Sequence, residues 1–134
     1  IVRPEEIYAS ADLTGTALIL LVEVEDAVRT FSSRALANKG YRVLEASGGK
    51  SALELIEEKK PELELLITDV VMPEMDGPTL AKIVRQKLPG IKIIFISGYA
   101  EDKFKEQLGE EVYFLPKPFT LKQLAAKVKE VLEK

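Results

Sequence analysis

From residue 16 onward, the hydrophobic positions of the chain follow two alternating patterns. The first is a short, uninterrupted apolar run with β-branched residues, which is typical of a strand buried on both faces of a sheet. Three of these runs are strong and two are weaker: Ala17–Val22, Leu65–Thr68 and Ile91–Ile96, then Tyr41–Glu45 and Val112–Leu115. They predict five strands.

The second pattern is a stripe of apolar residues at helical spacing, which indicates an amphipathic helix that covers one side of a sheet. It predicts four clear helices and a shorter, more polar one: Asp26–Asn38, Lys50–Lys59, Pro78–Leu88 and Thr120–Leu132, then Ala100–Leu108. A helix between each pair of strands implies parallel strands with right-handed crossovers. We therefore predict an α/β fold with one doubly wound parallel sheet.

Single residues mark the ends of these helices. Gly40 follows the first helix, where the chain needs a positive φ. Pro61 and Pro89 stop the second and third helices. Asp76 precedes the third helix and Thr120 the last one, so both are predicted N-caps.

The first fifteen residues, 1–15, show no sustained hydrophobic period. We interpret them as a linker, with a tail packed loosely on the domain as the alternative, and residues 16–134 as one domain. Because the first residue is Ile1 and not Met, we expect the chain to be part of a longer protein.

Composition excludes several classes of function. The chain has 134 residues, a net charge of −3, no cysteine and no histidine. Without cysteine, it can form no disulfide and has no thiol nucleophile. Without histidine, it has no Ser-His-Asp triad and no phosphohistidine of its own. A mildly acidic domain is a poor candidate for direct nucleic-acid binding. No apolar run reaches the roughly 18 residues of a membrane span, so we expect no membrane contact.

Polar side chains follow four of the five predicted strands. Glu23 follows the first strand, Asp69 the third, Ser97 the fourth, and Lys117 comes shortly after the fifth. Parallel sheets of this kind place their sites at the carboxyl ends of the strands. We therefore expect two acids, a hydroxyl and an amine to converge on one edge of the sheet.

This set of groups suits phosphoryl transfer to a carboxylate. Asp69, at the end of the central strand, is the candidate nucleophile. Glu23 and a backbone carbonyl near Val71 are candidate oxygen ligands for Mg²⁺. Lys117 supplies positive charge and Ser97 a donor for phosphoryl oxygens. Each residue alone has an ordinary explanation as a cap, turn or loop residue, so the hypothesis depends on their joint arrangement.

Residues Thr16–Leu132 resemble the receiver domain of two-component response regulators. The specific motif is Ile67–Gly77, in which Asp69 matches the phosphoacceptor. The resemblance implies a flavodoxin-like (βα)5 fold with strand order 2-1-3-4-5. It also implies that the domain catalyses its own phosphorylation and dephosphorylation.

The resemblance gives further residues a role. Ser97 matches the family's Ser/Thr switch position and Phe114 its aromatic switch position. Lys117 matches the lysine of the family's Lys-Pro loop, and we expect a cis peptide between Lys117 and Pro118.

Two segments, Asn38–Ala46 and Phe95–Asp102, resemble the C-terminal receiver of hybrid histidine kinases. Among these, the alphaproteobacterial cell-cycle kinases of the CckA type are the most similar in sequence. The resemblance implies a phosphorelay with two partners, a histidine kinase domain and a histidine phosphotransferase. It also implies a cytoplasmic domain whose parent protein can be membrane-anchored.

One position departs from the family. Receivers have a second acid after the first strand that holds Mg²⁺, and here that position is Val24. Two unit charges about 4 Å apart interact by roughly 4 kcal/mol at an effective dielectric near 20. Water screens part of this interaction between the missing carboxylate and the metal ion. We therefore expect Val24 to reduce the affinity for Mg²⁺ by about tenfold or more. We expect Glu25 to point elsewhere and not to replace the missing acid.

Other interpretations stay open. Because of Val24, the serious alternative is a receiver-like protein interaction module that is impaired in phosphorylation. Two enzyme or cofactor folds are disfavoured. A haloacid-dehalogenase-type phosphatase needs an acid where Val71 stands, and a flavodoxin needs a phosphate loop after the first strand, whereas Thr14–Thr16 lies before it. The sequence at Gly48–Ser51 resembles the end of a P-loop, but Leu44 stands where the leading glycine belongs, so we interpret it as a helix-start turn.

Overall fold

The structure is a computed structural model that describes residues 13–59, 62–97 and 112–134. The predicted helix Ala100–Leu108 lies outside the described residues. None of the helices within the described ranges is long and apolar enough to span a membrane.

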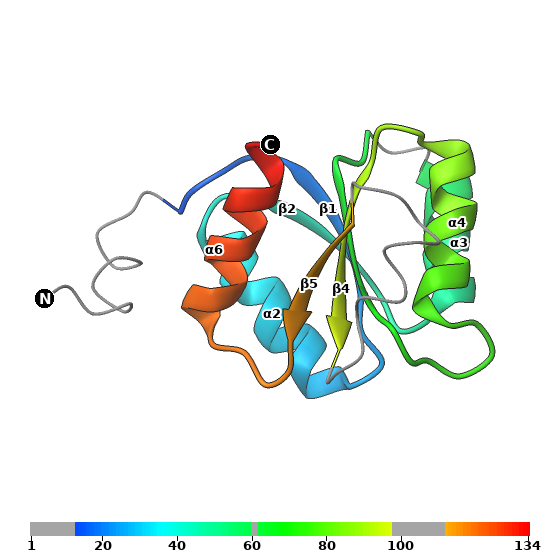
Figure 1. The fold of residues 1–134 in the computed structure, drawn as a ribbon, viewed down its shortest axis with the longest axis horizontal. Coiled ribbons are helices and arrows are strands. Elements are labelled where there is room, and N and C mark those ends of the chain that lie inside the picture. The colour runs from blue at the N-terminus through cyan, green and yellow to red at the C-terminus, as the bar shows by residue number, and fades with distance from the viewer. Residues whose placement is uncertain (1–12, 60–61, 98–111) are drawn as a thin grey trace, which may run out of the picture.

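Five parallel strands form one sheet at the centre of the molecule (Figure 1). They are β1 (Leu18–Val22), β2 (Arg42–Ala46), β3 (Leu65–Asp69), β4 (Lys92–Ser97) and β5 (Val112–Pro116). Their order in the sheet is β2-β1-β3-β4-β5, and each pairs in parallel with its neighbours. The predicted fold class and strand order are confirmed.

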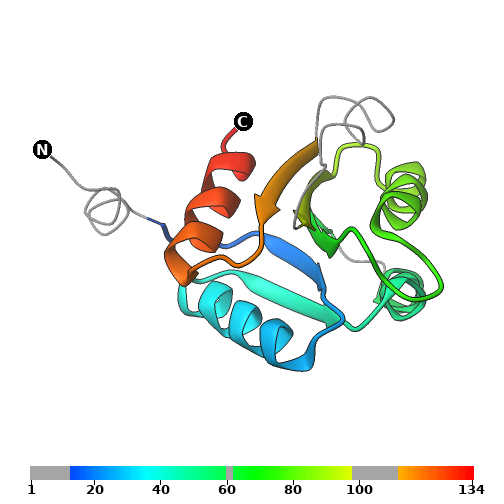
Figure 2. The same cartoon turned by 60° about the horizontal axis from the view of Figure 1, so that its bottom comes forward.

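Four described helices cover the sheet on two sides. They are α2 (Asp26–Asn38), α3 (Gly49–Lys59), α4 (Gly77–Lys87) and α6 (Leu121–Leu132). Helices α2 and α6 lie on one face, and α3 and α4 lie on the other (Figures 1 and 2). The predicted ends of these helices and of the strands agree with the structure to within one residue.

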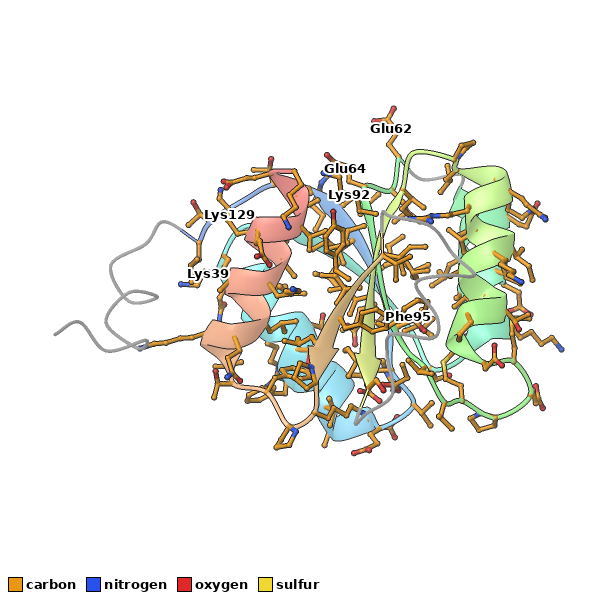
Figure 3. All side chains as sticks on the ribbon, in the orientation of Figure 1. Lys39, Glu62, Glu64, Lys92, Phe95 and Lys129 are labelled. Carbon is orange, nitrogen blue, oxygen red and sulfur yellow. The ribbon has the colours of Figure 1, made fainter. Side chains whose placement is uncertain are left out.

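Side-chain alternation along the strands divides the core into two clusters. On β4, Ile93 and Phe95 pack toward α3 and α4, whereas Ile94 and Ile96 pack toward α2 and α6. Phe95 is fully buried between the sheet and its helices (Figure 3). Because the central strands are covered on both faces, polar groups at their carboxyl ends are held in a largely dry setting.

Three of the predicted boundary residues act locally as expected, whereas Pro61 lies outside the described residues. An Asp76 carboxylate oxygen accepts a hydrogen bond from the backbone N–H of Thr79, 2.8 Å away, at the start of α4. Thr120 and Gln123 form a reciprocal capping box at the start of α6. Gly40 has a φ of 102°, and the Lys117–Pro118 peptide is cis as predicted.

The last residues of the predicted linker pack on the domain. Leu13 is buried, and the backbone N–H of Gly15 donates to the Lys39 carbonyl oxygen at 2.9 Å. The Lys129 ammonium donates to the Thr14 carbonyl oxygen at 2.6 Å, and Figure 3 shows Lys39 and Lys129 on this side of the molecule. For residues 13–15 this agrees with a packed tail rather than a free linker.

Candidate functional site

Three side chains from three different elements meet at the carboxyl edge of the sheet. Lys117 Nζ lies 2.9 Å from Glu23 Oε1 and 3.2 Å from Asp69 Oδ1. Glu23 is fully buried and Asp69 is 5% exposed. The predicted convergence of these three groups is present in the structure, and their chemical roles remain predictions.

Backbone amides fix both carboxylates. The N–H of Val24 donates to Asp69 Oδ2 at 3.0 Å, and the N–H of Glu25 donates to Glu23 Oε2 at 3.0 Å. Arg29 Nη1 donates to the Glu23 carbonyl oxygen at 2.7 Å, which ties the β1–α2 turn to the helix. The prediction missed Arg29 as a positioning residue. Its place one turn into the helix after an acidic strand end was the available signal.

The charges of these groups are strongly coupled. Burial, and then the neighbouring Glu23 carboxylate, raise the pKa of Asp69 to about 7, although the Val24 amide and Lys117 act in the opposite direction. Burial acts to raise the pKa of Glu23, but hydrogen bonds with Asp69, the Glu25 amide and Lys117 hold it below its usual value. Burial acts to lower the pKa of Lys117, but Glu23 and Asp69 raise it. Near neutral pH the site therefore holds a Glu23–Lys117 ion pair beside a partly protonated Asp69.

The loop between β3 and α4 starts and ends against Asp69. The N–H of Val70 donates to the Ile96 carbonyl oxygen at 3.1 Å, and the N–H of Gly77 donates to the Val70 carbonyl oxygen at 2.8 Å. A Cβ on Gly77 would overlap the backbone oxygen of Asp69. Glycine at this position therefore lets the loop close tightly next to the buried carboxyl group.

The three groups line an open cleft of about 520 Å³. Its walls are Glu23, Val24, Glu25, Asp69, Val71, Met72, Pro73, Ile96 and Lys117. Val71 is 85% exposed at this edge of the cleft. Glu25 Oε1 lies 3.8 Å from Lys117 Nζ, so the expectation that Glu25 points elsewhere is wrong. The side chain of Glu25 lies at the mouth of the cleft, while its backbone N–H donates a hydrogen bond to Glu23 Oε2.

The donor set of the cleft fits Mg²⁺ with few protein ligands. Val24 contributes no oxygen from its side chain, which packs against the core cluster on the α3/α4 side of the sheet. Within the described ranges, no group of three or more His, Cys, Asp or Glu residues is arranged to hold a metal. Glu23, Asp69 and the main-chain carbonyl of Val71 remain as oxygen donors, and Mg²⁺ readily keeps waters at its other positions.

Neither Ser97 nor Phe114 is among the residues that line the cleft. Ser97 ends β4, and its carbonyl oxygen accepts a hydrogen bond from the Lys117 N–H at 3.1 Å. The Phe114 ring is tilted against Phe95, with ring centroids 5.7 Å apart. The backbone therefore connects Ser97 to the lysine, while the switch roles of both residues stay predictions.

Comparisons with known proteins agree on one family. Residues 19–129 match the family described as the response regulator receiver domain. The chain is 53% identical over 134 residues to the sensor kinase CckA of Brucella abortus (strain 2308), covering 98% of this chain and 14% of that protein. It is 37% identical to the response regulator receiver protein CpdR of the same organism, covering 85% of this chain and 95% of that protein.

Solved structures give the same result. The crystal structure of the receiver domain from the hybrid histidine kinase CckA is 46% identical with a TM-score of 0.75, and covers 87% of this chain and 99% of that one. The chemotaxis protein CheY4 of Vibrio cholerae is 26% identical with a TM-score of 0.78 over the same shares of the two chains. The chain therefore spans a small part of the kinase but nearly the whole of the single-domain relatives.

Proposed function

The chain belongs to the family of response regulator receiver domains, and from this premise we propose that it accepts a phosphoryl group on Asp69 from a phosphohistidine of a partner protein. The observation that supports this most directly is the contact of Lys117 Nζ with both Asp69 Oδ1 and Glu23 Oε1. A buried carboxylate held beside an ammonium group, at the floor of an open cleft, has the geometry that attack on a phosphoryl group requires.

The transfer is a displacement at phosphorus. An Asp69 oxygen forms a bond to phosphorus while the phosphorus–nitrogen bond of the phosphohistidine breaks, and the imidazole leaves with that electron pair and takes up a proton. Lys117 pairs with the negative oxygens of the phosphoryl group, and Glu23 keeps Lys117 in place. The Val24 amide holds Asp69 Oδ2, which leaves Oδ1 on the side of Lys117.

Receiver domains generally bind Mg²⁺, and here Glu23, Asp69 and the carbonyl of Val71 are the groups that we expect to hold it. When bound, Mg²⁺ supplies positive charge to the phosphoryl oxygens. Val24 removes one carboxylate from this set, so we expect an affinity about tenfold or more below that of a receiver with an acid there. Glu25, at the mouth of the cleft, is too exposed to restore a fixed ligand.

The response to phosphorylation is proposed to run through Ser97 and Phe114. Ser97 would turn toward the new phosphoryl group, and Phe114 would fill the space that it leaves. The hydrogen bond between the Ser97 carbonyl and the Lys117 N–H supports this, because it joins β4 directly to the lysine loop.

An apolar surface beside Lys117 is suited to the partner that carries the phosphohistidine. Phe31 on α2 is 46% exposed and Leu121 at the start of α6 is 44% exposed. Phe31 and Lys117 line the same hollow of about 380 Å³, so this surface is continuous with the mouth of the cleft. A helix resting on Phe31 would present its histidine to Asp69, as both a histidine kinase domain and a histidine phosphotransferase require. In a longer parent chain, residues 1–15 would connect the receiver to the preceding domain.

The proposal is tested by phosphorylation with acetyl phosphate and Mg²⁺, followed by intact mass measurement. We expect the protein to gain one phosphoryl group, and the Asp69→Ala variant to gain none. Asp76→Ala is the matched control, because Asp76 is an exposed N-cap outside the cleft and its loss leaves the gain intact. Equal labelling of the protein and of Asp69→Ala would refute Asp69 as the acceptor.

A second candidate function follows from Val24: a receiver-like interaction module with impaired phosphorylation. Its prediction differs in one respect. The protein would gain no mass even at Mg²⁺ concentrations far more than tenfold above those that suffice for Val24→Asp, where the weakened site of a working receiver is filled. The same experiment therefore separates the two functions.

A further inference from the structure

A second concave surface lies on the far side of the β3–α4 loop from the cleft. It is a groove of about 1070 Å³ between α3 and the loop, and Figure 2 shows the loop curving past α3. Leu53, Pro73 and Met75 form its apolar floor. Glu54, Glu58 and Glu74 form an acidic rim. No step of the proposed phosphotransfer uses this groove.

The groove is built by a close contact that glycine permits. A Cβ on Gly49 would lie 2.6 Å from the sulfur of Met75 and 3.1 Å from its Cβ, so glycine lets Met75 pack on α3 without a shift of its side chain. Glu74, one residue earlier, has a φ of 67°, an uncommon backbone conformation for a residue with a side chain. Together these features hold Met75 in the floor and leave Glu74 exposed at the rim.

The charge around the groove is unbalanced. Its lining contains four glutamates and one lysine, Lys50. Glu57 pairs with Lys87 of α4. In the part of the chain that the structure describes, no ion pair neutralises Glu54, Glu58 or Glu74. A concentration of negative charge beside exposed apolar surface favours a positively charged, partly apolar partner and repels phosphate-rich ones.

We propose that this groove is a docking surface for a cationic amphipathic helix of a partner protein. The apolar side chains of that helix rest on Leu53 and Met75, and its lysine or arginine side chains pair with Glu54 and Glu58. Pro73 lines both the groove and the phosphoacceptor cleft, so the bound helix contacts the loop next to Asp69. The mouth of the cleft beside Lys117 stays open, and the partner can remain bound during phosphotransfer.

The test uses a fluorescent synthetic peptide about 18 residues long, roughly five helical turns, with leucine and lysine at amphipathic helical spacing. Fluorescence anisotropy measures its affinity, and amide chemical shifts map where it binds. We expect the shifts to lie on α3 and residues 73–75, and a peptide with glutamate in place of lysine to show no binding. Shifts centred on α2 or α6 would overturn the proposal.

Variants separate the groove from general charge attraction. We expect the double variant Glu54→Lys and Glu58→Lys to weaken binding about tenfold or more. The control, Glu62→Lys and Glu130→Lys, makes the same change in net charge at exposed positions outside the groove. Equal weakening by both double variants, at equal thermal stability, would refute the groove as the binding surface.

Two further results complete the test. Leu53→Asn removes the apolar floor without a change in charge, and we expect it to weaken binding by about the same factor. Unchanged affinity in a folded Leu53→Asn variant would contradict an apolar contact there. All of these measurements use the unphosphorylated protein without a phosphodonor, so their outcome does not depend on the proposed phosphorylation. Self-association of the domain through the groove would replace the proposed occupant with a second copy.

Discussion

Replacing Val24 with aspartate changes both the stability of the metal-free protein and its response to Mg²⁺. The new carboxylate would stand at the residue whose backbone N–H donates to Asp69 Oδ2 at 3.0 Å, with Glu23 and Glu25 on either side in the sequence. The Val24 side chain also packs against the core cluster on the α3/α4 side, and aspartate loses that contact. Both effects destabilise the metal-free fold.

The magnitude follows from the distances. Two unit charges about 4 Å apart repel by roughly 4 kcal/mol at an effective dielectric near 20. Val24 is half-buried and lines the open cleft, so water screens part of this repulsion. We expect a net loss of about 1–2 kcal/mol in the free energy of unfolding near pH 8, where Asp69 is ionised, which is the size of effect that an unpaired charge commonly has.

Mg²⁺ offsets this loss of stability. The added carboxylate is a third acidic ligand, so we expect affinity for Mg²⁺ to rise about tenfold or more, or about 1.4 kcal/mol for each factor of ten. Because Mg²⁺ binds the folded state, the stabilisation grows with the ratio of its concentration to the Kd. At saturating Mg²⁺ the variant is expected to gain more stability than the parent protein.

The assay is urea denaturation of the parent protein, Val24→Asp and Val24→Asn, each with EDTA and with Mg²⁺. Asparagine is close to aspartate in size and lacks the charge, so it isolates the electrostatic part. We expect Val24→Asp to be less stable than Val24→Asn in EDTA and to respond more strongly to Mg²⁺. An unchanged midpoint in EDTA together with an unchanged Mg²⁺ response would refute this account of position 24.

Three further changes test the site and its loop. Because the pKa of folded Asp69 is raised to about 7 from 3.8, its ionisation makes the fold lose stability as pH rises from about 4 to about 7. Asp69→Asn removes this loss. The amount by which its unfolding free energy exceeds that of the parent protein is expected to be up to about 2–3 kcal/mol larger at pH 8 than at pH 5, measured by urea denaturation. An equal difference at both pH values would contradict a raised pKa for Asp69. Gly77→Ala places a Cβ against the Asp69 backbone oxygen and is expected to lower the unfolding free energy by about 2 kcal/mol or more, whereas Gly90→Ala, which meets nothing within 4 Å, is the control. Glu74→Gly removes the strain at a φ of 67° and is expected to raise the thermal midpoint by a few degrees, up to about 1 kcal/mol of stability, with no gain for Glu62→Gly.

The sheet and the core of the site were predictable because they depend on chain-wide periodicity. Apolar runs place Glu23 and Asp69 at strand ends, and parallel strands bring those ends together. The position of Glu25 was not predictable in this way. Its exposed side chain belongs to the irregular β1–α2 turn, and its approach to Lys117 follows no repeating pattern of the sequence.

The groove beside α3 was also beyond prediction from the sequence, for a different reason. The glycines at positions 48 and 49 predict only a turn at the start of a helix. What favours glycine at position 49 is Met75, which comes 26 residues later and reaches it only after β3 has been placed in the sheet. A contact between two loops of one sheet edge has no period, so it becomes visible only when the topology is known.

The loop between β3 and α4 connects the two surfaces physically. It begins directly after Asp69 with Val70, whose backbone is hydrogen-bonded to Ile96 and Gly77. Further along the same loop, Met75 packs against Gly49 of α3. We expect a change at Asp69 that shifts the start of the loop to alter the contact of Met75 with α3 as well. If phosphorylation changes the binding free energy of a helix in the groove, binding of the helix changes the free energy of phosphorylation by the same difference. Measuring peptide affinity before and after phosphorylation gives the size and the sign of this coupling, and identical affinities would show that the loop does not transmit it.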